Sequence, residues 1–205
     1  MAQSSDTKGR DRTRTEAAIV AAARDVLAEA GFQGFGVNAV ARRAGCDKQL
    51  IYRYFGGLEG LVDAIGVEIA GWLGDSLAAG GDPPASYAEL AERLILGFLE
   101  ALRGNVLVQR IAAWEIADPS PLVARLTQAR GVALVRWMAR TRGDLVPPAS
   151  VDAPALNIFL IAAVQQLVLS GAAVGSFSGV GLATEADWDR VRAAAVRIVR
   201  AVYAA

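Results

Sequence analysis

The sequence predicts an all-α protein with an N-terminal helix-turn-helix domain and a larger helical domain after it. Apolar residues recur at helical spacing along most of the 205 residues, and glycine or proline residues separate the periodic segments. No segment shows the alternating pattern of a β-strand. We therefore expect about nine helices. The predicted domains are residues 1–57, with a flexible N-terminal arm, and residues 58–205.

The first predicted helix ends at Gly31, and its apolar face carries Ile19, Ala22, Ala23, Val26 and Leu27. The segment before it is polar and charged, without the apolar run of a secretory signal. Its arginines at positions 10, 12 and 14 fit two interpretations equally well. They could belong to a disordered tail or to an arm that enters the minor groove of DNA.

Two short helices follow at helix-turn-helix spacing. The first spans Val37 to Ala44 and is closed by Gly45, and the second spans Lys48 to Tyr54 and is capped by Asp47. Helical spacing places four polar side chains on one face of the second helix: Lys48, Gln49, Tyr52 and Arg53. Ile51 and Phe55 point the other way, toward the first helix. Such side chains can donate to base edges and phosphates, so this helix is predicted to recognise DNA.

Proline, glycine and capping residues divide the rest of the chain into further helices. They are expected at about residues 58–79, 86–103, 106–117, 121–142 and 153–175, with a final helix capped by Thr184. The final helix carries a narrow apolar seam that should pack on another helix: Trp188, Val191, Ala195, Ile198 and Val202. The segment SFSGVGL before it is expected to form a glycine-rich loop.

Composition narrows the classes of function. The chain has no histidine and one cysteine, Cys46, which argues against histidine-based catalysis, a disulfide and a metal centre. We expect neither an enzyme nor a cofactor or metal site. Residues 1–56 carry nine basic and six acidic residues, whereas the rest carries twelve and fifteen, so a polyanionic partner suits only the front of the chain. The protein is expected in the cytoplasm.

Hydrophobic residues make up 54% of the chain, and the longest uncharged segment, residues 153–184, contains no Asp, Glu, Lys or Arg. The segment is long enough to span a membrane, but it contains Asn157, Gln165 and Gln166 and lacks basic or aromatic flanks. We expect it to be a helix at a helix–helix interface and not a membrane span. Together with the final helix, it should form the interface of a homodimer.

The run TEAAIVAAARDVLAEAGFQGFGVNAVARRAGCDKQLIYRYFGGLEGL, residues 15–61, resembles the N-terminal domain of tetracycline-repressor (TetR) family regulators. The residues that match the family pattern are Ile19, Ala22, Ala23, Leu27, Gly31, Phe32, Ala41, Gly45, Ile51, Tyr52 and Phe55. The match covers about a quarter of the chain. It implies a DNA-binding regulator, with the remaining residues as a domain for ligand binding and dimerisation.

The resemblance also implies DNA contacts at Val37, Asn38, Lys48, Gln49, Leu50, Tyr52, Arg53 and Tyr54. The sequence departs from the family at three places. Phe35-Gly36 leaves the short helix with only a glycine cap, Leu50 stands where threonine is frequent, and Leu58 replaces a phosphate-binding lysine. The last departure puts the strength of DNA binding in question.

A largely apolar effector is expected in the second domain. The residues that could line or orient it are Trp72, Phe98, Gln109, Trp114, Glu115, Trp137, Asn157, Phe159 and Gln165. The leading interpretation is a homodimeric repressor that such a molecule releases from a palindromic operator. The alternative is a helical small-molecule-binding or interaction protein with weak or lost DNA binding, which Leu58 and the zero net charge would favour.

Overall fold

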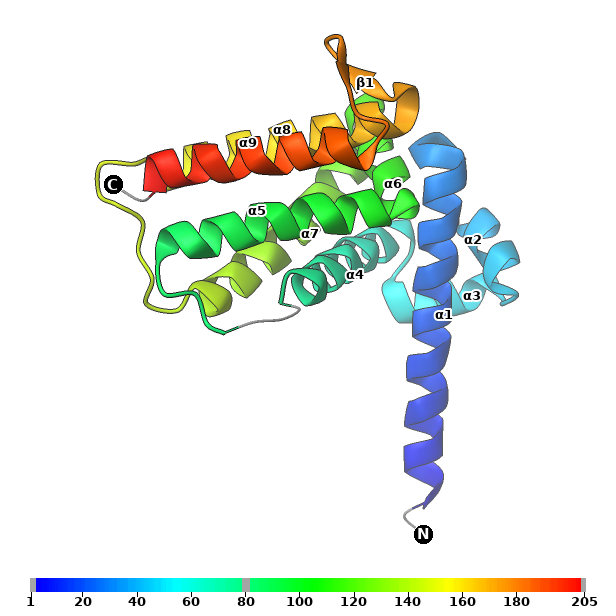
Figure 1. The fold of residues 1–205 in the computed structure, drawn as a ribbon. Coiled ribbons are helices and arrows are strands. Elements are labelled where there is room, and N and C mark those ends of the chain that lie inside the picture. Colours follow the sequence, from blue (N-terminus) through cyan, green and yellow to red (C-terminus); the bar gives the residue numbers. More distant parts are fainter. Residues whose placement is uncertain (1–2, 79–81, 204–205) are drawn as a thin grey trace. The chain divides into compact units, whose positions relative to one another are not determined.

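The computed structural model describes residues 3–78 and 82–203 of the chain, with side chains from residue 11 onward. Nine helices and one short β-hairpin make up these residues. The helices are α1 (Gln3–Gly34), α2 (Val37–Ala44), α3 (Lys48–Phe55), α4 (Leu58–Ala78), α5 (Tyr87–Gly104), α6 (Val106–Ala117), α7 (Pro121–Arg142), α8 (Ala153–Val174) and α9 (Glu185–Tyr203). Figure 1 shows their order along the chain, and the prediction of an all-α fold is confirmed.

The chain folds into two compact units. The first comprises residues 1–71 and 110–133, and the second comprises residues 72–109 and 134–205. Helices α4, α6 and α7 therefore each contribute residues to both units. The functional boundary predicted at residue 57 stays a prediction, since these compact units divide the chain by packing alone.

In the first unit, α1, α2 and α3 form the predicted helix-turn-helix arrangement (Figure 1). The apolar face of α1 is buried, including Ile19, Ala23 and Leu27. Gly45 ends α2 in the left-handed conformation, and the next amide, of Cys46, donates to the carbonyl of Ala41 at 3.1 Å. These bonds satisfy the last carbonyls of α2 and set the tight turn into α3.

The α3–α4 connection is equally tight. A side chain on Gly60 would bring its Cβ to 1.9 Å from the carbonyl oxygen of Phe55, so only glycine fits there. The first turns of α4 then bury Leu61, Val62 and Ile65. The close approach fixes the direction in which α4 leaves α3.

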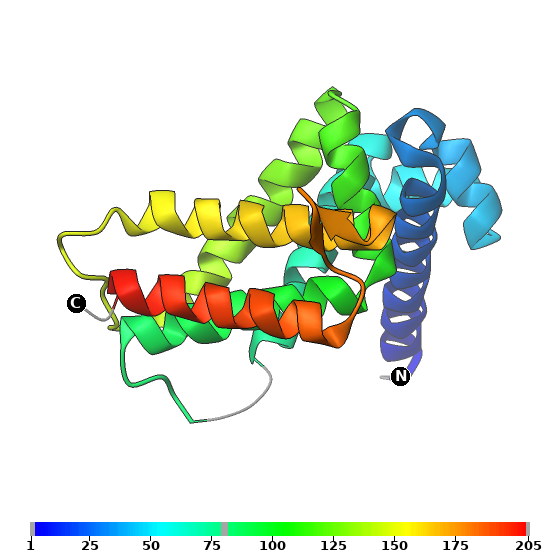
Figure 2. The same cartoon turned by 45° about the horizontal axis from the view of Figure 1, so that its top comes forward.

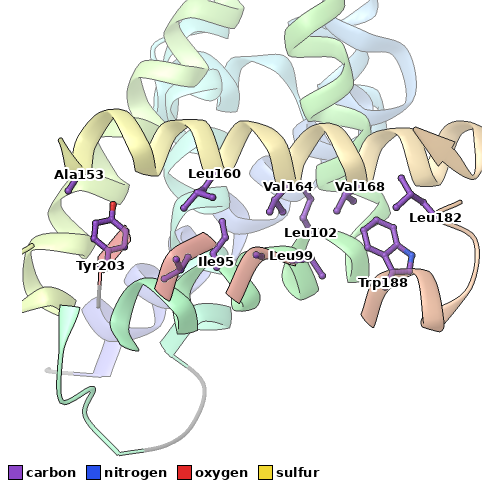
Figure 3. Packing of buried hydrophobic residues seen from close by; sticks show 12 residues of the cluster. Ile95, Leu99, Leu102, Ala153, Leu160, Val164, Val168, Leu182, Trp188 and Tyr203 are labelled. Atoms are coloured by element: carbon purple, nitrogen blue, oxygen red, sulfur yellow. The ribbon is translucent and has the colours of Figure 1, made fainter. Parts of the chain in front are cut away.

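In the second unit, α5 packs against both α8 and α9, and Figure 2 shows the three helices running alongside one another. Their buried side chains form one apolar cluster, most of which is labelled in Figure 3. Ile95, Leu99 and Leu102 of α5 meet Leu160, Val164 and Val168 of α8 and Trp188 of α9. This cluster is the core of the second unit.

The seam predicted on α9 is correct in part. Trp188 and Ala195 are buried, but Ile198 is 47% exposed, and Val199 and Tyr203 are buried in its place. Arg192 and Arg200 of α9 form ion pairs with Glu100 and Glu92 of α5, at 2.7 Å each. These pairs flank the apolar contact between α5 and α9.

Two further predictions need correction. The segment predicted as a glycine-rich loop contains an antiparallel hairpin, β1 (Ser176–Phe177) and β2 (Val180–Gly181), turned through Ser178 and Gly179 at positive φ. The backbone of the predicted flexible arm is helical from Gln3, continuous with α1. Arg12 and Glu16, four residues apart, form an ion pair at 2.7 Å that stabilises this extension. The side chain of Arg10 lies outside the described residues.

Candidate nucleic-acid interface

Helix α3 presents a polar face on an apolar anchor. The side chain of Asp47 caps the helix by accepting the amide of Gln49 at 2.8 Å. Ile51 is fully buried, whereas Lys48, Gln49 and Arg53 are exposed and Tyr52 is 55% exposed. Leu50, Tyr54 and Phe55 are half-buried. Four of the predicted DNA-contacting side chains are therefore accessible: Lys48, Gln49, Tyr52 and Arg53. The burial of Ile51 holds the helix against the rest of the unit.

Helix α2 begins beside this face without a side-chain cap, as the sequence predicts for Gly36. Asn38 is exposed and Val37 is half-buried, and Val40 and Ala41 hold the helix against the core of the unit. The free amides at the start of α2 can donate to a phosphate oxygen because no side chain satisfies them.

Some basic side chains of this unit form ion pairs within the fold, and others have no acidic partner among the described residues. Arg43 forms a two-point ion pair with Glu29 of α1. Among the described residues, Arg42, Lys48 and Arg53 have no carboxylate partner. An exposed surface with unpaired cations and few acids attracts a polyanion such as DNA.

Two arginines lie against the ring of Tyr54. The guanidinium carbons of Arg12 and Arg53 lie over its ring, at 5.4 Å and 5.2 Å from the ring centroid. Arg12 comes from the N-terminal extension of α1, which the sequence alone did not connect to α3. The spacing of Arg12 and Glu16 signals a helix, but it carries no information about Tyr54.

Cys46 occupies the turn between α2 and α3 and is half-buried. Burial, with a smaller contribution from the charge of Asp47, raises the pKa of its thiol. A raised pKa keeps the sulfur protonated at neutral pH and lowers its reactivity.

The start of α4 differs from a phosphate-binding site. Leu58 is half-buried and offers only apolar surface. Glu59 follows it and pairs with Arg125 of α7 at 2.8 Å, and Arg125 also binds Asp63 at 2.7 Å. The pairing neutralises the acid, so the first turn of α4 contributes neither a cation nor a free anion to the interface.

Contacts within the first unit tie α6 and α7 to α1 and α4. Trp114 of α6 lies against Gly31 of α1, where an added Cβ would come within 2.8–2.9 Å of three indole ring atoms. Glu115 binds Arg130 of α7 through two hydrogen bonds of 2.6 and 3.0 Å. Arg24 of α1 pairs with Glu68 of α4 at 2.8 Å. Trp114 and Glu115, both predicted to contact a ligand, thus have partners inside this unit.

Two other predicted ligand-binding residues have their polar groups satisfied by neighbours in the second unit. The side-chain amide of Gln109 donates to the carbonyls of Leu102 and Arg103, at 2.8 and 3.1 Å, and so caps the end of α5. Asn157 donates to the hydroxyl of Tyr87 at 3.1 Å and accepts from Tyr203 at 2.9 Å. The sequence carried no signal for the tyrosine pair, since Tyr87 and Tyr203 lie at opposite ends of the unit's sequence.

The remaining five predicted ligand-binding residues have no such polar partner among the described residues. Trp137 lies against Gly74 of α4, and Phe98 packs on the apolar cluster. Trp72 and Gln165 are half-buried. Phe159 is 72% exposed, on the outer face of α8. These five residues belong to the second unit, whereas Trp114 and Glu115 belong to the first.

No group of three or more histidine, cysteine, aspartate or glutamate residues in residues 3–78 and 82–203 is arranged to hold a metal ion. Within the same residues, α8 is the one helix long and apolar enough to cross a membrane. Only 17% of its most apolar window is buried. A single helix of this kind is weak evidence for a membrane span.

The chain is similar to known proteins in part of its sequence and in its fold. Residues 19–65 match the family model of bacterial regulatory proteins, tetR family. No curated protein sequence matches the chain significantly.

Solved structures share the fold over nearly the whole chain, and several of them are TetR-family proteins. Salmonella enterica GusR is 16% identical, covers 94% of this chain and 96% of its own, and has a TM-score of 0.67. A TetR family transcription regulator from Marinobacter aquaeolei VT8 is 20% identical, with coverages of 93% and 96% and a TM-score of 0.60. Residues 19–65 therefore match the tetR family of bacterial regulatory proteins, and the chain shares its all-helical fold with solved structures that include a TetR family transcription regulator.

Proposed function

We propose that the protein is a homodimeric transcriptional repressor that binds a near-palindromic operator and is released by a small, largely apolar molecule. The observation that carries the DNA-binding part is α3, whose exposed Lys48, Gln49, Tyr52 and Arg53 stand on a buried Ile51. Two such helices, one per subunit, would enter successive major grooves. Lys48, Gln49 and Leu50 would read bases, while Tyr52, Arg53 and Tyr54 would contact the backbone, with Val37 and Asn38 beside them.

The dimer interface is proposed on α8 and α9. Helix α8 buries one stripe in the core and exposes an uncharged one, which carries Ile158, Phe159, Ile161, Ala162, Gln166 and Ala173. Ile198 of α9 is exposed as well. Large apolar side chains at solvent-exposed positions on a helix without charges are typical of a subunit interface. A second copy of the chain would cover them.

The effector site is proposed in the second unit, where Trp72, Phe98, Trp137 and Gln165 remain available for a ligand. Aromatic walls with one amide suit a mostly apolar molecule with a single polar group. If the molecule binds the DNA-free conformation more tightly, operator and effector must weaken each other's affinity by the same factor. A repressor of this kind performs no chemistry and acts in the cytoplasm, where its operator lies.

Selection from a library of random duplexes tests the proposal. The full-length protein and a Lys48→Ala/Gln49→Ala variant are each used to enrich bound sequences at moderate salt. We expect the wild-type protein to enrich an inverted repeat and the variant to enrich none. Native mass spectrometry of the wild-type protein would show the dimer and any co-purified small molecule.

Failure to enrich any sequence, by a protein that is folded and dimeric, would overturn the repressor proposal. A retained small molecule together with that failure would instead support a ligand-binding protein that has lost DNA recognition.

A further inference from the structure

Arg12, Arg53 and Tyr54 form a cluster that joins the N-terminal extension of α1 to the recognition helix. Both guanidinium groups lie over the same tyrosine ring, at 5.4 and 5.2 Å from its centroid. An arginine stacks on an aromatic ring through its cationic plane and leaves its N–H groups free at the edge. Two like charges, one from α1 and one from α3, therefore lie next to Tyr54.

The hydrogen-bond partners of the cluster leave most of its donors unused. Glu16 accepts the Nε–H of Arg12 at 2.7 Å, which orients the guanidinium. The two terminal nitrogens of Arg12 have no partner among the described residues, and Arg53 has no carboxylate partner there. Two cations around one ring repel each other, so an anion between or beside them would be stabilised by both.

We propose that Arg12 and Arg53, positioned by Tyr54, bind one phosphate of the DNA backbone in each subunit. The inference rests on the proposed DNA-binding function and adds to it a contact from outside the helix-turn-helix. Terminal guanidinium nitrogens suit phosphate oxygens because they can donate two parallel hydrogen bonds. Arg12 would therefore act on the backbone from a helix, in contrast to a flexible arm in the minor groove.

The salt dependence of binding to a random duplex isolates this contact. Each protein–phosphate contact contributes about 0.9 to the slope of log affinity against log salt. Because both arginines bind the same phosphate, the double variant Arg12→Gln/Arg53→Gln should lower the slope by about 0.9 for every subunit that touches the duplex, and each single variant should lower it by part of that amount. Arg14→Gln is the matched control, because Arg14 is exposed on the same helix and has no contact with Tyr54.

A second pair of variants tests the role of the ring. Tyr54→Phe keeps the ring and should leave the effect of Arg12→Gln unchanged. Tyr54→Leu removes the ring, and in that background Arg12→Gln should weaken binding by a smaller factor than in the wild-type protein. Circular dichroism confirms that each variant is folded before binding is measured.

The outcomes separate the two proposals. If the wild-type protein binds duplex DNA but Arg12→Gln has the same slope as Arg14→Gln, the phosphate site is wrong and the DNA-binding function stands. An Arg12→Gln effect that is equally large with and without the Tyr54 ring would overturn the positioning role. If the wild-type protein binds no duplex at any salt concentration, both proposals fail.

Discussion

At the scale of single residues, α3 divides its side chains into a buried apolar group and an exposed polar group. Ile51 is fully buried, and its exposed neighbours carry the polar groups. This division follows from helical spacing, so it was predictable from the sequence. The contact between Arg12 and Tyr54 was not, because it joins residues 42 positions apart that no periodic pattern relates.

The assignment of Gln49 to base reading yields the first prediction. Gln49→Ala should relax preference at one base position in each half-site and cost about 1–3 kcal/mol on the best site, because a side-chain amide can pair with two atoms of adenine. Titration of the operator and of variants changed at single positions measures both effects. Equal weakening on operator and random DNA would place Gln49 on the backbone instead.

At the scale of elements, α8 has two apolar faces with different uses. One contributes Leu160, Val164 and Val168 to the core, and the other remains exposed. The sequence predicted a helix at an interface because it lacks charges over its whole length. It could not show which stripe faces α5, since both stripes are apolar.

The exposed stripe of α8 gives a direct test of dimerisation. Phe159→Glu should yield monomers, because a charge at the centre of an apolar interface would be buried without a partner. Val135→Glu on α7 is a suitable control, since Val135 is 70% exposed and lies outside the proposed interface. Sedimentation velocity measures the mass of each variant. A dimer that persists in Phe159→Glu would move the interface away from this stripe.

The junction of α5, α8 and α9 predicts a pH dependence. Burial, with smaller contributions from Tyr87 and Asp152, raises the pKa of Tyr203 to about 12. Because the folded pKa lies above the unfolded value of about 10, the stabilisation is complete below pH 10 and is lost as the pH rises toward 12. Urea unfolding from pH 8 to 12 should show this loss.

Tyr203→Phe separates the two contributions of this side chain. It should be less stable at pH 8, because Asn157 loses the hydrogen bond from the hydroxyl. It should also show a weaker decline in the alkaline range. A decline as steep as that of the wild-type protein would assign the pH dependence to another group.

At the scale of the whole molecule, glycine, proline and capping residues predicted most helix ends within one or two residues. Three features escaped prediction for physical reasons. The strands of the hairpin have two residues each, too few for an alternating pattern. The N-terminal extension of α1 has no apolar face, so hydrophobic periodicity gives no signal for a helix there. The ion pair between Arg12 and Glu16 stabilises its helical form. The burial of Val199 and Tyr203 in place of Ile198 depends on contacts of α9 with α5 and α8, which no local pattern contains.

The composition of the first unit leads to a prediction for hydrogen exchange. Residues 110–133 pack with α1 and α4 through Trp114, Arg125 and Arg130. Binding of duplex DNA should therefore slow amide exchange in residues 110–133 as well as in α1–α3, because the unit opens cooperatively. Exchange measured by mass spectrometry, with and without DNA, tests this. Protection confined to residues 19–65 would show that α6 and α7 open independently.

The contact between Trp114 and Gly31 has an optical consequence. Of the four tryptophans, Trp114 is the one that lies in the first unit, and its ring rests on the backbone of α1. Its emission should therefore respond to movement of α1, whereas Trp72, Trp137 and Trp188 report on the second unit. A variant that keeps only Trp114 would turn the protein into its own fluorescent sensor, one that reads the DNA-binding helices without an attached dye.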